Sequence, residues 1–237
     1  MPDAVIATLG WIAATGLVAL PGLVMARDRT KWLWLPAALL LMAAYDALLT
    51  LGYGHIPIHF WPSDWNWEGK TLSLLLSLAI AAALGWRRVG LTLRQDRKGL
   101  PGALVFCALL GALFVGLALR SPDEGFTVDS LAFELTMPGL DEELFYRGVL
   151  LLMLNEAFGK PLKVLGAPMG WAAIVTSVAF GLAHALGYEN GAFTFDAVTM
   201  AFTGGPALLL VWLKEKTGSL LLPVVMHNFA NSISMLI

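Results

Sequence analysis

Three apolar stretches in the second half of the sequence contain side chains that can do acid–base chemistry. "DEELFYR" places Glu142 in the first stretch, "FGLAH" places His184 in the second, and "HNFAN" places His227 and Asn231 in the third. No serine, cysteine or lysine stands out beside them as a nucleophile. A carboxylate can activate a water molecule, and imidazole and amide groups can stabilise the oxyanion that forms when this water attacks a carbonyl. The residue types therefore indicate hydrolysis of an amide or an ester.

The first stretch contains adjacent glutamates followed by an arginine. Residues four positions apart lie on one face of an α-helix, so we expect Glu143 to pair with Arg147. Glu142 is rotated by about 100° from Glu143, and we expect it to remain without a charged partner. A free carboxylate in a site of low dielectric suits general-base catalysis. The alternative is a structural ion network that locks helices together.

The other two stretches each place two functional groups on one helix face. Phe180 and His184 are four residues apart, and so are His227 and Asn231. A single histidine at such a place is compatible with a satisfied core residue, and His227 with Asn231 is compatible with hydrogen bonding between membrane helices. Ionisable groups inside membrane segments are unfavourable unless they are paired or functional. Three polar sets in one chain therefore favour a functional site.

The composition predicts the elements that hold these groups. Of the 237 residues, 58% are hydrophobic and 14% are charged, whereas about 25% are charged in soluble domains. Apolar runs long enough to span a bilayer recur along the chain. We predict an all-α, polytopic membrane protein, a single domain over residues 1–237 that forms a bundle of about eight transmembrane helices. The predicted spans are about 4–26, 33–53, 70–86, 101–119, 130–156, 167–187, 194–213 and 218–236.

Several features narrow this prediction. The span at 130–156 is long, so it is expected to tilt or to begin with an interfacial piece. The net charge of −2 gives no sign of nucleic acid binding, so the expected partner is the lipid bilayer. One cysteine allows neither a disulfide framework nor a thiolate zinc site. His55 and His59 can bind a metal in principle, but their aromatic segment is better interpreted as an interfacial loop.

Basic residues are distributed unevenly between the connections. Twelve of the 15 Lys and Arg residues lie in alternate connections, whereas the intervening ones are mainly acidic. Lys70 and Arg120 are expected at span ends. Because Lys and Arg favour the cytoplasmic side, both termini are predicted to be extracytoplasmic, in a bacterial inner (plasma) membrane. The candidate site then opens toward the outer half of the bilayer.

The ordered motifs resemble a known family. "EELFYR" is similar to an EExxxR motif, "FGLAH" to an FxxxH motif and "HNFAN" to an HxxxN motif. Together they resemble the CAAX-protease and bacteriocin-processing family of intramembrane glutamate proteases, whose eukaryotic relative is the Ras-converting enzyme. The resemblance covers about residues 130–237, which would be the catalytic half, and residues before it carry no such signature.

The resemblance implies a role for each matched position. Glu142 would activate the water with help from His184, and His227 and Asn231 would stabilise the oxyanion. The supporting residues would be Glu143, Arg147 and Phe180. No metal or other cofactor is implied. The expected function is an intramembrane endopeptidase that matures the membrane-anchored C-terminal segment of a protein or peptide substrate, such as a CAAX-like tail or a sorting signal.

Three alternatives remain open. Two histidines and a carboxylate can form a zinc site with an open position, although the sequence lacks an HExxH motif. The polar groups can also form the relay of a non-enzymatic membrane transporter. The third alternative is an immunity or scaffold protein whose site is inactive.

Overall fold

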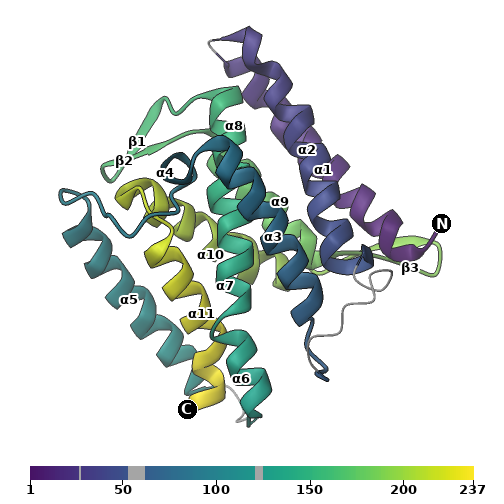
Figure 1. The fold of residues 1–237 in the computed structure, drawn as a ribbon, viewed down its shortest axis with the longest axis vertical. Helices are drawn as coiled ribbons and strands as arrows, with labels where there is room; N and C mark the ends of the chain where they lie inside the picture. The colour runs from purple at the N-terminus through teal and green to yellow at the C-terminus, as the bar shows by residue number, and fades with distance from the viewer. Residues whose placement is uncertain (27, 53–61, 121–124) are drawn as a thin grey trace.

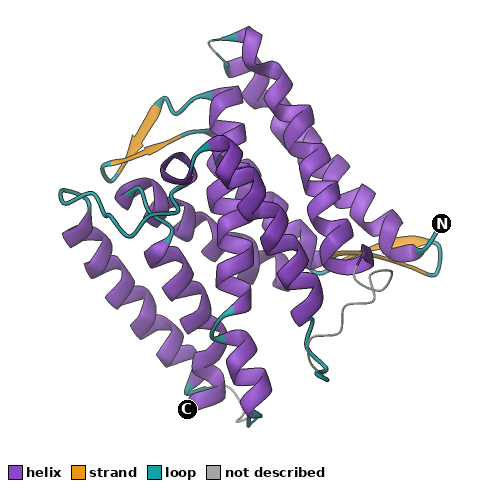
Figure 2. Cartoon of the chain, viewed as in Figure 1, coloured by secondary structure: helices purple, strands orange, loops and turns teal. Residues whose placement is uncertain are grey.

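Helices make up most of the protein in the computed structural model, which describes residues 1–26, 28–52, 62–120 and 125–237 (Figures 1 and 2). The first helices are α1 (Asp3–Met25), η1 (Arg29–Leu33), α2 (Trp34–Asp46), η2 (Ala47–Gly52), α3 (Trp67–Leu84), α4 (Trp86–Val89) and α5 (Leu100–Ala118). The later helices are α6 (Val128–Glu134), α7 (Met137–Glu142), η4 (Glu143–Leu150), α8 (Leu151–Phe158), α9 (Trp171–Ala185), α10 (Ala197–Thr217) and α11 (Leu221–Leu236). Here η1 is a 3₁₀ helix, and η2 and η4 are π-helices. His55 and His59 lie outside the described residues.

Five helical segments in the described ranges are long and apolar enough to cross a membrane. They are Asp3–Val24, Thr30–Leu51, Trp67–Leu84, Leu100–Ala118 and Ala197–Thr217, and the shorter helices α9 and α11 are also apolar. On α5, the exposed fractions of Leu104, Leu109 and Leu113 are 50%, 67% and 55%. Lipid, not water, is the favourable surrounding for such a surface. The chain is an integral membrane protein, and the predicted helical membrane fold is confirmed.

The long predicted span at 130–156 is divided into two parts. Helix α6 begins with a capping box, in which Thr127 and Ser130 satisfy each other's backbone N–H groups, and it ends at Glu134. The second part starts at Met137 with Pro138 in its first turn, where a missing N–H is tolerated. It continues through α7, η4 and α8 to Phe158. The separate α6 agrees with the expected short initial piece.

Two β-hairpins lie in the connections on either side of the predicted span at 167–187 and overlap the ends of predicted spans. Strand β1 (Leu162–Val164) pairs antiparallel with β2 (Ala167–Met169), and β3 (Leu186–Glu189) pairs with β4 (Ala192–Phe195). The predicted spans at 167–187 and 194–213 were therefore wrong at their ends. Two residues with positive φ form each turn, Leu165–Gly166 and Asn190–Gly191. Such pairs favour tight hairpins over continued helix.

The π-helix η4 lies at the centre of the bundle, and all of its residues are buried. Phe145 on η4 stacks on Tyr45 of α2 with ring centroids 3.7 Å apart. Helices α9 and α10 cross closely at Gly181 and Gly204, because a Cβ at Gly181 would lie only 3.2 Å from the Cα of Gly204. Small residues allow this approach between membrane helices. Packing on both sides thus holds η4 and α9 in a defined position.

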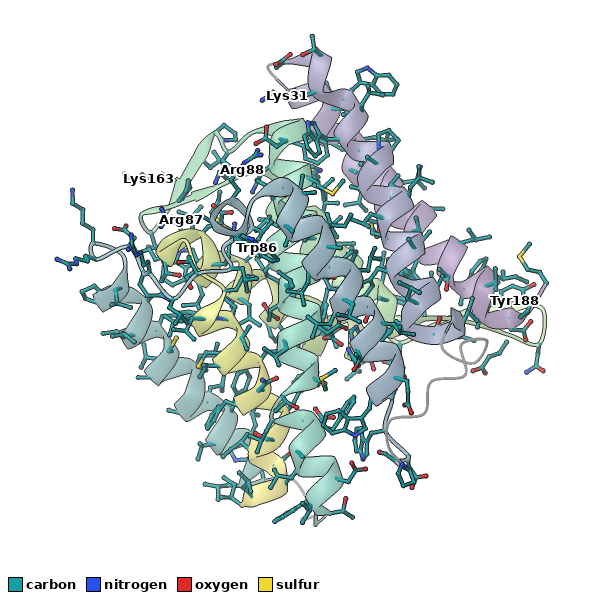
Figure 3. All side chains as sticks on the ribbon, viewed as in Figure 1. Lys31, Trp86, Arg87, Arg88, Lys163 and Tyr188 are labelled. Carbon is teal, nitrogen blue, oxygen red and sulfur yellow. The ribbon has the colours of Figure 1, made fainter. Side chains whose placement is uncertain are left out.

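The basic connections meet at one end of the bundle. Figure 3 shows Lys31, Arg87, Arg88 and Lys163 toward this end and Tyr188 away from it. Glu156 joins two of these connections, since its carboxylate lies 3.1 Å from the Lys31 ammonium and 3.0 Å from the Arg88 guanidinium. The alternating distribution of charge in the sequence therefore corresponds to one spatial end of the molecule.

Candidate active site

A cavity of about 360 Å³ lies inside the helix bundle. Six of the seven residues singled out from the motifs line it: Glu142, Arg147, Phe180, His184, His227 and Asn231. The seventh, Glu143, is fully buried and contacts two of these side chains. The tertiary structure thus brings together groups from three motifs that are up to about 90 residues apart in the chain.

Glu143 links the first motif to the third. Its Oε1 lies 3.1 Å from a guanidinium nitrogen of Arg147 and accepts a hydrogen bond from Nδ1 of His227 at 2.6 Å. The expected ion pair between Glu143 and Arg147 is confirmed, and both side chains are at most 1% exposed. The guanidinium also lies over the ring of Phe180, 4.3 Å from its centroid. Because one histidine nitrogen is bound to Glu143, the other is directed toward Glu142, at 3.5 Å.

The prediction that Glu142 lacks a charged partner is wrong. The Nζ of Lys70 on α3 donates a hydrogen bond to Oε1 of Glu142. Lys70 is only 8% exposed, so it is not at a solvated span end. The reasoning from helix geometry considered partners within one helix, whereas Lys70 lies 72 residues earlier in the chain. A partner on another helix cannot be found from i,i+4 spacing.

Asp141 is a further buried carboxylate of this site. It is fully buried, and it accepts hydrogen bonds from the Tyr45 hydroxyl at 2.6 Å and from the Ser73 hydroxyl at 2.9 Å. Its Oδ2 also lies 3.4 Å from Nζ of Lys70. Lys70 therefore contacts two carboxylates, one of which is fixed by two hydroxyl groups.

His184 is oriented by its own helix. Its Nδ1 donates to the carbonyl oxygen of Phe180 at 2.7 Å, so Nε2 is the ring nitrogen that does not bind this carbonyl. The Phe180 ring centroid lies 4.5 Å from the centroid of His184 and 6.0 Å from that of His227. Phe180 thus packs against both imidazoles and lies under the Arg147 guanidinium. These contacts place both rings on the cavity wall.

The third motif contains one amide that faces the cavity and one that holds two helices together. Asn231 donates through Nδ2 to a carboxylate oxygen of Glu134 at 2.8 Å. Asn228 accepts a hydrogen bond from the backbone N–H of Gly139 at 2.7 Å. This N–H belongs to the first turn of α7, where no helical partner exists. Asn228 therefore fixes the start of α7 against α11.

Sequence reasoning missed Lys70, Glu134, Asp141 and Asn228 as parts of this arrangement. A signal for Lys70 was present, because Lys70, Ser73 and Ser77 recur at intervals of three and four residues along an apolar helix. That spacing places them on one face, and all three are buried. A polar face on an apolar helix predicts polar partners on a neighbouring helix. It does not show which helix provides them.

The spatial grouping of possible metal ligands bears on the zinc alternative. Within residues 1–26, 28–52, 62–120 and 125–237, no three His, Cys, Asp or Glu side chains are grouped so that they could hold a metal ion. Glu142 contacts Lys70, and His184 contacts a carbonyl oxygen through Nδ1. These contacts do not resemble the arrangement of two histidines and a carboxylate around an open zinc position.

The membrane-spanning helices and the buried polar cavity define a polytopic membrane protein with an internal site of ionisable groups. Residues 125–233 match the family model described as "Rce1-like: Type II CAAX prenyl endopeptidase", and they form a domain of that family. The comparison with curated proteins gives no match, and neither does the comparison with solved structures. Membership in the family implies a membrane protease that acts on proteins. All seven motif residues lie in the matched range, and Lys70 lies outside it.

Proposed function

We propose that the protein is an intramembrane endopeptidase in which Glu142 activates water. The observation that carries this proposal is the single cavity lined by Glu142, His184, His227 and Asn231. Water can be held between the Glu142 carboxylate and Nε2 of His184, which is the free nitrogen of that ring. The family match supports peptide-bond hydrolysis as the reaction.

The proposed reaction has two steps. The water oxygen attacks the carbonyl carbon of the scissile peptide bond while Glu142 accepts the water proton. The carbonyl π electrons move to oxygen, and the oxyanion accepts hydrogen bonds from His227 and Asn231. When the tetrahedral intermediate collapses, the C–N bond breaks and Glu142 returns the proton to the amine nitrogen. The carboxylate is thereby regenerated.

The contacts of His227 determine how it can act. Its Nδ1 donates to Glu143, so Nε2 can donate to an oxyanion only when the ring carries both protons. Glu143 contacts Nδ1 of the ring and Glu142 lies near Nε2. Glu143 therefore supports catalysis by orienting His227. Asn231 has a second N–H in addition to the one bound to Glu134, and this hydrogen is the second proposed oxyanion donor.

The location of the cavity supports a substrate that enters from the outer half of the membrane. Of the lining residues, Phe202 and Thr203 of α10 and Phe114 of α5 lie in the halves of these helices that are far from the basic end. Lys70 is near the start of α3, whereas Arg87 and Arg88 follow the end of that helix. If the basic end is cytoplasmic, the cavity faces the extracytoplasmic half.

We therefore propose that the enzyme matures the membrane-anchored C-terminal segment of another protein, in a bacterial inner membrane. A sorting signal of a secreted or surface protein fits the outer half of the bilayer better than a prenylated cytoplasmic tail does. The apolar lining of the cavity, which includes Leu110, Leu210 and Met226, suits a hydrophobic segment.

The test compares protein C-termini in membranes from cells that produce either the wild type or Glu142→Gln. Loss of the general base should reduce cleavage by at least about 10²-fold, so new C-termini should accumulate only with the wild type. Glu156→Gln is the matched control, because Glu156 lies at the basic end and outside the cavity. If the same new C-termini are found in equal amounts with the wild type and with Glu142→Gln, the proposal is refuted.

The metal-free mechanism has its own test. Treatment of the purified protein with a strong chelator should leave cleavage of the identified substrate segment unchanged. If chelation abolishes cleavage and zinc restores it, a zinc-dependent mechanism replaces the one proposed.

A further inference from the structure

Lys70 is a buried cation that the family match does not cover, since α3 precedes residues 125–233. Its ammonium contacts the Glu142 carboxylate and lies 3.4 Å from Asp141. A lysine that is 8% exposed inside a membrane protein is unfavourable unless other groups compensate its charge. Its position on the cavity wall, beside the proposed base, therefore requires an explanation beyond helix packing.

Asp141 makes the contact of Lys70 with Glu142 compatible with general-base catalysis. If Glu142 were the only partner of Lys70, protonation of Glu142 would leave a buried cation without compensation, and proton uptake would be opposed. Asp141 remains beside Lys70 and is held in place by hydrogen bonds from Tyr45 and Ser73. Glu142 can therefore change its charge during the reaction while Lys70 stays paired.

We infer that Lys70 is a positioning residue of the proposed peptidase, which orients the Glu142 carboxylate toward His227 and keeps it ionised, with Asp141 as its second carboxylate partner. This inference rests on the proposed function. Lys70 does not react with the substrate; it acts through Glu142. The elements before the family domain thus contribute directly to the site, through one ammonium group.

Other charged and titratable groups also act on Glu142, and the test must allow for them. The groups that surround it on the packed elements are Lys70 (α3), Tyr45 (α2), Glu134 (α6), Asp141 (α7), Glu143 and Arg147 (η4), Tyr146 (η4), His184 (α9) and His227 (α11). The comparison of variants changes one of these groups at a time. Lys70 and Asp141 are the informative pair, because their charges have opposite signs.

The first measurement needs no substrate. Infrared titration of the full-length protein in detergent follows the carboxyl band of Glu142, which is assigned by its absence in Glu142→Gln. In Lys70→Met, Glu142 should become protonated at a pH about one to three units higher than in the wild type. Lys70→Arg retains the positive charge and should stay within about half a unit. Asp141→Asn removes a neighbouring negative charge and should move the transition to lower pH.

The second measurement follows cleavage of a quenched fluorescent peptide that carries an apolar segment of about 20 residues followed by a short polar C-terminal tail, as in a membrane-anchored sorting signal. The acid limb of kcat/KM should move to higher pH in Lys70→Met, and raising the pH or substituting arginine should restore activity. Lys214→Met is the matched control, because Lys214 is 6% exposed and pairs with Glu215 outside the cavity. Its pH profile should equal that of the wild type.

The outcomes separate this inference from the proposed function. An unchanged Glu142 band in Lys70→Met, or an equal shift in Lys70→Arg, overturns the role of Lys70 even if Glu142→Gln is inactive. Equal cleavage by the wild type and Glu142→Gln overturns the proposed function, whatever the infrared titration shows. If Lys70→Met does not fold, Asp141→Asn and Lys70→Arg still test the inference. Protonation of Glu142 at lower pH in Asp141→Asn, together with an unchanged protonation pH in Lys70→Arg, supports the inference. Any other result contradicts it.

Discussion

The buried ion pair between Glu143 and Arg147 provides a quantitative test of how the site is stabilised. Both side chains are at most 1% exposed, and Glu143 also accepts a hydrogen bond from His227. Glu143→Gln keeps the shape of the side chain but leaves the Arg147 charge without a partner. Breaking a buried pair by removing one charge destabilises proteins by about 3–5 kcal/mol.

The lower end of this range applies here. The glutamine oxygen can still accept the hydrogen bond from His227, and the Phe180 ring still attracts the guanidinium from 4.3 Å. We therefore expect Glu143→Gln to lower the free energy of unfolding by about 3 kcal/mol. For a chain of this size, the corresponding fall in Tm is roughly 6–12 °C.

Reversible unfolding in mixed detergent micelles measures the free energy, and thermal unfolding followed by circular dichroism measures Tm. Glu156→Gln is the matched control, because Glu156 pairs with Lys31 and Arg88 at the surface. Surface ion pairs contribute about 0–1 kcal/mol, so this control should change little.

A double-mutant cycle separates the ion pair from general effects of substitution. Adding Arg147→Met to Glu143→Gln removes both charges, and the loss should be smaller than the sum of the two single losses by about 1–3 kcal/mol. If Glu143→Gln loses no more stability than Glu156→Gln, or if the two losses in the cycle simply add, the reasoning about the buried pair is refuted.

Three further predictions concern α7, α10 and the hairpin of β3 and β4. Gly139→Ala should lower the free energy of unfolding by about 1–3 kcal/mol in the same micelle assay, because its Cβ would overlap the Asn228 side chain; a neutral effect would contradict this close contact. Asp196 caps α10, and hydrogen bonds from Thr199 lower the pKa of its carboxyl group. The stabilising effect of this cap is therefore complete above the pKa in the unfolded chain, about 3.9, and is lost as the pH falls through the lower pKa of the folded protein. Asp196→Ala should therefore reduce Tm at pH 7 and have no effect in strong acid, and a Tm difference that is independent of pH would count against this role. Tyr188→Cys, in a background without the native cysteine, should react with a membrane-impermeant reagent from the extracytoplasmic side; protection there would reverse the predicted orientation.

Features that depend on neighbouring residues could be read from the sequence. The pair of Glu143 and Arg147 followed from helical spacing, and the structure confirms it. Apolar runs predicted a helix in every span region, because burial in lipid depends on the composition of one continuous segment. The turn at Asn190–Gly191 lies in the predicted connection between the spans at 167–187 and 194–213, and such dipeptides favour positive φ; the strands on either side of it were not predicted.

Contacts between distant segments could not be read in this way. The partner of Glu142 is Lys70, and the partner of Asn231 is Glu134, which lies 97 residues earlier in the chain. The periodicity of a helix shows which of its faces is polar, but it does not show which helix lies against that face.

The sequence by itself determined that the chain enters a membrane, that its later helices carry carboxylate, imidazole and amide groups, and that the ordered motifs resemble a protease family, because each of these depends on residue types along one segment. Only the tertiary structure decided which charges meet. The close packing of α3 and of α11 against α7 sets the distances between Lys70, Glu142 and His227, and electrostatic interactions in a buried site depend on those distances.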